Sequence, residues 1–78
     1  MLFRSFVQVN LDKSIMMNSN LSFGTFPEST FVRANLYETI SIGGNFEKTN
    51  FTNANLTRVD FMGATLIEAN FQIGRAHV

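Results

Sequence analysis

Large apolar residues recur at every fifth position of this chain, from Phe6 to Phe71. Of fifteen Phe and Leu residues, twelve share this one phase of five. The residue before each of these central positions is Asn in seven cases, and the residue two before is nearly always small. The chain therefore repeats a unit of the form small–Asn–Phe/Leu–x–x.

A period of five fits neither a helix nor a straight strand. Five residues rotate a side chain by roughly 140° on an α-helix, so the apolar residues would wind around it. On a strand, successive central residues would alternate between its two faces. We therefore expect a coil that bends once per unit. The central and small residues point inward together, and the Asn and the last two residues face water or form the corner.

A second period, of twenty residues, predicts the size of the coil. Phenylalanine recurs at this spacing in two columns, which are Phe6, Phe26 and Phe46, and Phe31, Phe51 and Phe71. Four units per coil would stack the coils at about 4.8 Å as parallel, hydrogen-bonded neighbours. Two columns of charge agree with this register, namely Glu28, Lys48 and Glu68, and Glu38 with Arg58. The neighbouring cations Lys13 and Arg33 break the pattern.

The units resemble the pentapeptide-repeat family, whose repeat is usually written Ala-(Asn/Asp)-Leu-x-x. The cleanest copies are Ala34-Asn35-Leu36, Ala54-Asn55-Leu56 and Ala69-Asn70-Phe71. The resemblance covers about residues 6–72. It is strict from Phe31 onward and looser before it, where Ile15 and Met16 replace the usual residues. It implies an all-β fold, a right-handed quadrilateral parallel β-helix, and the handedness comes from the resemblance alone.

Both ends depart from the repeat. Residues 1–5 include Met1, Leu2 and Phe3, and we expect a hydrophobic cap there, with a docking site as the alternative. Translation of ATC GGA AGA GCA CAC GTC, a string that resembles a sequencing adapter, gives residues 73–78. We therefore interpret this tail as adapter read-through on a truncated gene, and a genuine short cap is the alternative.

The central residue Ser41 is the one polar exception within the strict region. The phase survives across Ile40-Ser41-Ile42-Gly43-Gly44, so no net insertion has occurred. We expect a local bulge or turn in which the glycines supply positive φ and an isoleucine swings inward. The alternative is a binding loop or groove at Ser41–Gly44.

Composition and charge narrow the possible chemistry. The 78 residues have a net charge of zero, which argues against direct nucleic-acid binding. There is no cysteine, and the single histidine, His77, lies in the tail, so the serines have no partner for nucleophilic catalysis. The carboxylates are scattered over the units. The sequence predicts no catalytic, cofactor-binding or metal site and no cofactor, so we expect no enzyme.

These features favour a bacterial, non-catalytic scaffold that binds an unknown protein partner through exposed columns. The alternative, implied by the family resemblance, is a DNA-mimicking binder of a type II topoisomerase, which the near-zero charge disfavours. No membrane span and no signal peptide are evident, so we expect a cytoplasmic protein, and the alternative is a secreted effector. Open coil ends would favour end-to-end association of the chain with itself.

Overall fold

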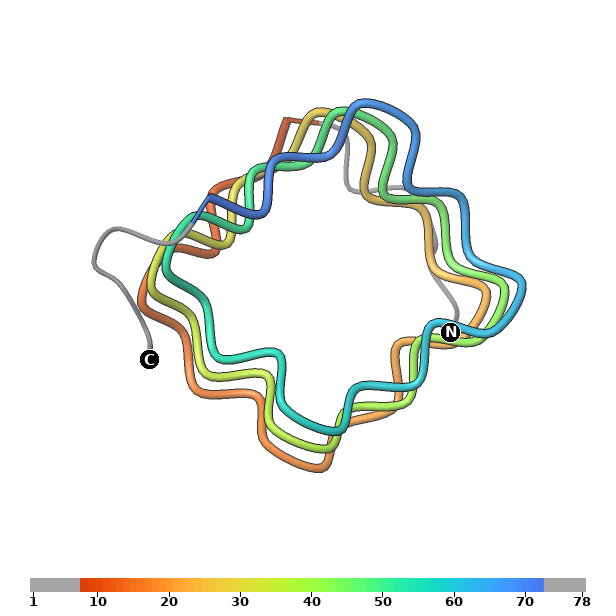
Figure 1. The fold of residues 1–78 in the computed structure, drawn as a ribbon, viewed down its shortest axis with the longest axis horizontal. Coiled ribbons are helices and arrows are strands. Elements are labelled where there is room, and N and C mark those ends of the chain that lie inside the picture. Colours follow the sequence, from red (N-terminus) through yellow and green to blue (C-terminus); the bar gives the residue numbers. More distant parts are fainter. Residues whose placement is uncertain (1–7, 73–78) are drawn as a thin grey trace.

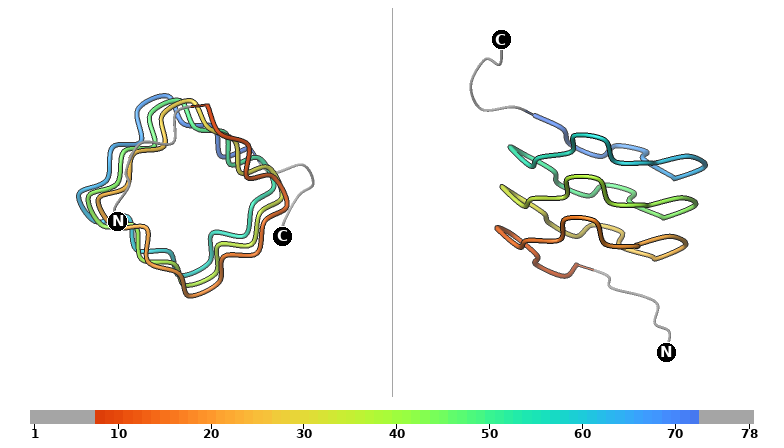
Figure 2. Two further views of the ribbon diagram at one scale, coloured as in Figure 1. Left: turned by 180° about the vertical axis from the view of Figure 1, so that it is seen from behind. Right: turned by 90° about the horizontal axis from the view of Figure 1, so that it is seen from below.

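The computed structural model describes residues 8–72, which wind as a stack of coils (Figures 1 and 2). Within this range there is no helix and no strand of several residues, but single-residue bridges separated by two-residue turns. All the bridges are parallel and join residues twenty apart, from Asn10↔Thr30 to Asn50↔Asn70. Each coil therefore contains four units, as the second period predicts. The fold is a β-helical solenoid whose stacked coils share a near-square outline (Figure 1).

A tight turn with positive φ occurs once in every unit. The last residue of each unit from Gln8 to Glu68 has a φ between 57° and 69°. The turn is closed by a backbone hydrogen bond from the next small residue to the central carbonyl, as from Ala34 N to Phe31 O at 3.0 Å. Positive φ at the third of four turn residues is the mark of a type II turn. These turns bend the chain once every five residues and so explain the period.

The five backbone N–H groups of a unit with an in-phase Asn use four kinds of acceptor. In the unit of residues 49–53, one N–H closes the turn and one donates to the preceding coil. Two donate to the following coil, and one donates to a side chain. The bonds are Thr49 N to Phe46 O (3.1 Å), Asn50 N to Ser29 O (2.9 Å), Phe51 N to Asn70 O (2.7 Å), Asn53 N to Gln72 O (3.0 Å) and Thr52 N to Asn50 Oδ1 (2.9 Å). Every backbone N–H of this unit is thus paired without any long strand.

The Asn before the central residue supplies that side-chain acceptor. Its Oδ1 accepts the N–H two residues onward in all seven in-phase cases, and Asp60 does the same for Met62. Two units without Asn solve the problem differently. Pro27, which follows Thr25 by two residues, has no N–H to satisfy. Val32 N donates to Asp12 Oδ1 of the preceding coil at 2.8 Å.

Stacked phenylalanine rings form the centre of the core. Phe26 lies on Phe46, Phe31 on Phe51, and Phe51 on Phe71, each with ring centroids 5.3 Å apart and nearly parallel planes. The two stacks contact each other edge to face, as between Phe26 and Phe31 at 5.7 Å. The predicted stacking of Phe51 between Phe31 and Phe71 is therefore confirmed.

The small position gives these rings their space. A Cβ on Gly24 would lie 2.7 Å from Phe26 Cε2, and a Cβ on Gly44 would lie 2.6 Å from Phe46 Cε2. Real Cβ atoms do not approach a ring so closely, so a larger residue at either position would displace the ring. This explains why large and small residues alternate along the inner surface.

The bulge expected at Ser41 is wrong. Ser41 N donates to Asp60 O at 2.8 Å and Gly43 N to Met62 O at 2.8 Å, which are the regular contacts of a unit. The side chain of Ser41 is buried, while Ile40 is exposed and Ile42 half-buried. The glycine at residue 43 holds the same positive φ that charged residues hold elsewhere. The regular hydrogen bonds keep the backbone in register, so the chain accepts a small polar residue without changing its path.

Several predictions from the sequence lie outside the described residues. These are the cap at residues 1–5, the start of the first phenylalanine column at Phe6, and the tail at 73–78 with His77.

Truncating a stacked central ring should be costly. We expect Phe51→Ala to lower the free energy of unfolding by about 3–5 kcal/mol, because Phe51 is fully buried between two rings. Met62→Ala, at a largely exposed position, should change it by less than about 0.5 kcal/mol. Chemical denaturation monitored by circular dichroism measures both values, and similar losses in the two variants would contradict the inward assignment.

Two buried threonines at equivalent positions should respond oppositely to loss of the hydroxyl. Thr49 Oγ1 donates to Phe26 O at 2.7 Å, whereas Thr39 Oγ1 is buried without a hydrogen-bond partner in the described chain. Thr49→Val should therefore destabilise the protein by about 1–2 kcal/mol, and Thr39→Val should be neutral or stabilising. The next coil already has Val59 in the Thr39 column. Thermal denaturation compares the two variants, and equal destabilisation would refute the assignment of the two hydroxyls.

Candidate functional site

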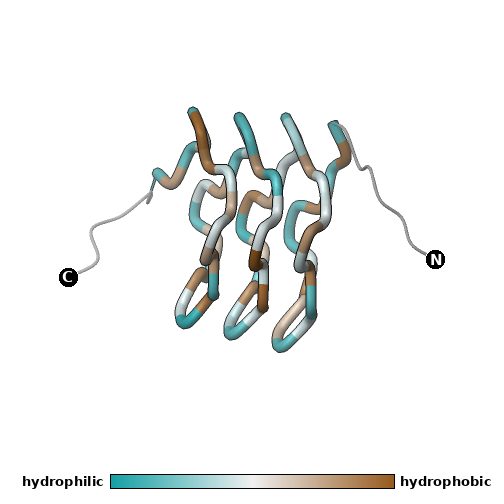
Figure 3. Tube along the Cα trace, turned by 90° about the vertical axis from the view of Figure 1, so that its right-hand side faces the viewer, coloured by the Kyte–Doolittle hydropathy of each residue, from teal (hydrophilic) through white to brown (hydrophobic). Residues whose placement is uncertain are grey.

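Three of the five residues in each unit point away from the core, and they form the surface of the solenoid. Hydrophobic and hydrophilic segments alternate along each coil in consequence (Figure 3). We number the four sides of the coil by their central residues: side 1 (Leu11, Phe31, Phe51, Phe71), side 2 (Met16, Leu36, Leu56), side 3 (Leu21, Ser41, Phe61) and side 4 (Phe26, Phe46, Leu66).

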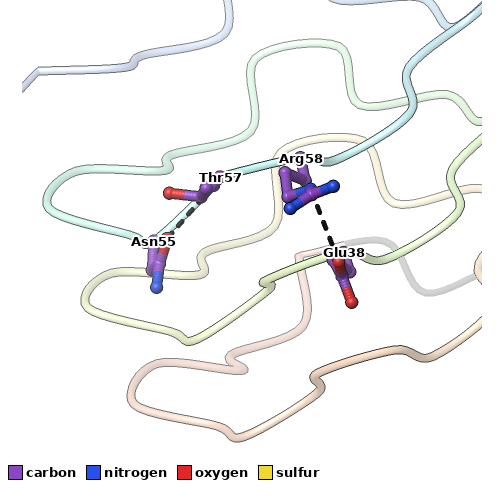
Figure 4. Close-up of polar contacts among 4 residues, drawn as sticks. All are labelled: Glu38, Asn55, Thr57 and Arg58. Carbon is purple, nitrogen blue, oxygen red and sulfur yellow. Dashed lines mark hydrogen bonds and ion pairs between the residues drawn. The ribbon is translucent and has the colours of Figure 1, made fainter.

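Side 2 carries the one ion pair among residues 8–72. Arg58 Nε lies 3.4 Å from Glu38 Oε2, between adjacent coils (Figure 4). The same view shows the turn contact of this side, in which Thr57 N donates to Asn55 Oδ1 at 3.1 Å. The predicted pairing of Glu38 with Arg58 is confirmed. Both side chains are well exposed, so the pair contributes little to stability.

The predicted charge column on side 4 forms no ion pair in the described chain. Glu28 instead accepts a hydrogen bond from Gln8 Nε2 at 3.0 Å. The charges of this side, three carboxylates against Lys48, sum to −2. Side 1 has two cations against Asp12, which gives +1, side 2 is neutral, and side 3 has Asp60 alone, which gives −1. No side of the described coil is therefore strongly charged.

Side 3 has exposed large apolar residues in all three of its described coils, whereas side 2 has Ile15 and Met17 in one coil only, and sides 1 and 4 have one each, Phe71 and Ile67. Phe23 is 77% exposed and Met62 69% exposed, and Ile40 lies between their two coils. The corner column that begins with Phe23 continues with Gly43 and Gly63. We call these outward residues of side 3 the apolar side, and define it as Phe23, Ile40, Ile42, Gly43, Met62 and Gly63. It is the most distinctive surface of the described chain.

Residues 8–72 show no group of three or more His, Asp or Glu side chains that could hold a metal ion. Three of the six acidic residues lie on side 4 and one on each other side, and the three on side 4 do not form such a group. Nor does this part of the chain contain a helix of the length and hydrophobicity needed to cross a membrane.

Comparison with known families places these repeats. Residues 44–72 match the family model described as Pentapeptide repeats (8 copies). This match confirms, for residues 44–72, the resemblance to the pentapeptide-repeat family predicted from the sequence. Proteins with pentapeptide repeats form β-helical solenoids and are generally non-catalytic structural repeat proteins. No curated protein matches the chain.

The same coil geometry extends N-terminally beyond the matched pentapeptide repeats. Parallel bridges join Asn10 to Thr30 and Ile15 to Asn35, although the early units depart from the consensus. Ile15 takes the usual Asn position and lies 79% exposed, while Met16 packs against the core from the central position. The coil thus extends beyond the residues that match the family model, and the repeat boundaries at about residues 6–72 stay a prediction.

Two features of the surface were missed by the sequence reasoning, and each has a signal. The thirteen positive-φ positions contain no Val, Ile or Thr, because a branched Cβ is strained in this conformation. The apolar side is signalled by Phe23. It is one of only three Phe and Leu residues outside the phase of five, and the other two, Leu2 and Phe3, precede the repeats.

The effect of a substitution at a positive-φ position on stability should depend on the backbone preference of the new residue rather than on lost side-chain contacts. Lys48 has a φ of 58° and an exposed side chain. Lys48→Gly should change the free energy of unfolding by less than about 1 kcal/mol, because relief of strain offsets the added entropy of the unfolded chain. Lys48→Val should destabilise by about 1–3 kcal/mol. Denaturant titration measures both, and a harmless valine would disprove the role of the turn.

Proposed function

We propose that this chain is a rigid, non-catalytic scaffold that binds a protein partner through the outer columns of its coil. The observation that supports this is the division of labour within a unit. The backbone bonds, the inner two residues and the Asn hold the coil together. The fold makes little use of the remaining outer side chains, since exposed residues such as Phe23 and Met62 contribute little to the core. Side chains that the fold does not need are free to recognise a partner.

The family and the coil geometry favour the finer description expected from the sequence, a right-handed quadrilateral parallel β-helix. Four units per coil and one turn per unit support the quadrilateral form. The handedness rests on the family. The hydrophobic cap at residues 1–5, the adapter-derived tail at 73–78 and the cytoplasmic location stay predictions.

DNA mimicry directed at a type II topoisomerase requires a strongly acidic surface. The most acidic surface of the described coil, side 4, carries a net charge of only −2, with Lys48 among its carboxylates. Partner binding through side chains of mixed character therefore fits the described surface better than mimicry of a polyanion does.

Substitution of the outer residues on one side of the coil at a time tests the scaffold proposal. Four variants, each with the outer residues of one side replaced by alanine except at Asn and positive-φ positions, should melt within a few degrees of the parent. Immobilised on a sensor, they would be compared for binding to proteins retained by the parent from an extract of the source cells. We expect loss of binding in one variant alone. Equal binding by all four, or no retained protein, would contradict the proposal. Added chain should also leave topoisomerase inhibition by quinolones unchanged.

A further inference from the structure

The glycines of the apolar side are not required by the backbone. Eleven of the thirteen equivalent turn positions hold other residues at the same positive φ, including Glu28, Glu38 and Glu68. What distinguishes Gly43 and Gly63 is therefore the missing side chain. Their two successive coils present a bare strip of backbone where every other corner column carries side chains.

An aromatic ring already occupies part of this strip. A Cβ on Gly43 would lie 2.6 Å from Phe23 Cε1 and 2.7 Å from Phe23 Cδ1, so the ring fills the place of a side chain at residue 43. At Gly63 the same construction meets nothing closer than Gly43 N, at 3.9 Å. The space next to Gly63 is thus open, whereas Phe23 fills the equivalent space next to Gly43. The neighbouring residue Met62 is exposed.

The pattern of this side is complementary to itself when reversed. Three coils contribute residues twenty apart, so an antiparallel second copy places each residue of the first coil opposite one of the third. Phe23 then faces Gly63 of the other copy, Asn20 faces Asp60, and Ser22 faces Met62. The middle coil meets itself through Ile40, Ile42 and Gly43. A bulky ring meets a bare backbone at both ends, as an isologous interface requires.

The polar pair in this arrangement also matches. Asn20 Oδ1 accepts from Ser22 N and Asp60 Oδ1 accepts from Met62 N, each within its own turn. The amide nitrogen of Asn20 and the second oxygen of Asp60 remain for contact across the interface, as donor and charged acceptor. A parallel two-fold arrangement would instead pair each coil with the same coil of the other copy. Phe23 would then not meet Gly63, and Asn20 would not meet Asp60.

We propose that the apolar side is a homotypic interface through which two copies of this chain associate side by side, antiparallel, about a two-fold axis at the level of Ile42. The surface of three coils amounts to a few hundred Å² per copy, below the roughly 800 Å² per partner typical of stable complexes. The dimer is therefore weak, with a dissociation constant above about 10 µM.

A substitution that fills the space next to Gly63 tests the proposal. Gly63→Glu places at residue 63 a charged side chain that this turn accepts at Glu28, Glu38 and Glu68, where the proposal places Phe23 of the other copy. Asn53→Glu, at the same turn position on side 1, is the matched control. Sedimentation equilibrium should show a weak dimer for the parent and the control, and a dissociation constant at least tenfold higher for Gly63→Glu. A parent that stays monomeric at millimolar concentration would overturn the proposal. So would undiminished association of Gly63→Glu, which would instead indicate end-to-end stacking.

Cysteine cross-linking tests the orientation, since the chain has no cysteine of its own. Under mild oxidation, Ile42→Cys should form a disulfide dimer with itself. Ser22→Cys and Met62→Cys should each remain monomeric alone but cross-link when mixed. Self-cross-linking of Met62→Cys would indicate a parallel dimer, and absence of any product from Ile42→Cys would refute the two-fold axis. Both results would be independent of binding to a different protein.

Discussion

The fold depends on one turn, repeated every five residues, whose last residue has positive φ. L-amino acids other than glycine, Asn and Asp seldom adopt this conformation, at a cost of roughly 1 kcal/mol or more each. Yet residues such as Lys48, Arg58 and Glu68 hold it in this chain. The turn persists because hydrogen bonds to adjacent coils fix it. Around Lys48, Phe46 N donates to Thr65 O at 2.8 Å, Lys48 N to Ile67 O at 2.9 Å and Asn50 N to Ser29 O at 2.9 Å. The backbone hydrogen bonds between coils thus hold the strained residue in place, and the turn at that residue brings the coils into position to form these bonds.

This turn also determines what each side chain can do. It leaves one backbone N–H per unit outside the ladder, and the Asn side chain two residues earlier accepts it. It places the central ring over its counterpart in the next coil, at a centroid separation of 5.3 Å. Because the coil spacing is fixed by backbone hydrogen bonds, aromatic rings stack well at the centre and a much larger small-position residue has no room.

The period of the sequence was sufficient to predict the inward residues, the coil of twenty residues and the Glu38–Arg58 pair, because a repeated unit states the same information many times. It failed where one unit departs from the rest. Ser41 was expected to distort the chain, but backbone bonds to Asp60 and Met62 keep its unit regular. The side-chain pattern alone cannot show this, since register in this fold is set by main-chain pairing rather than by the identity of one central residue. The apolar side was missed because the sequence shows which residues share a column but not that the ring of Phe23 lies against Gly43.

A repeat of this kind separates structural from functional information along the chain. Residues at the central and small positions are constrained by the core, so they say little about what the protein binds. The outer positions are constrained only by the turn, whose positive-φ position holds Glu, Lys, Arg, Asn or Gln in different units. The coil itself therefore does not explain Gly43 and Gly63 in successive coils, or the exposed Phe23 in the same column. The contact of Phe23 with Gly43 gives them a physical reason: removing two side chains exposes a strip of backbone on which an aromatic ring can lie.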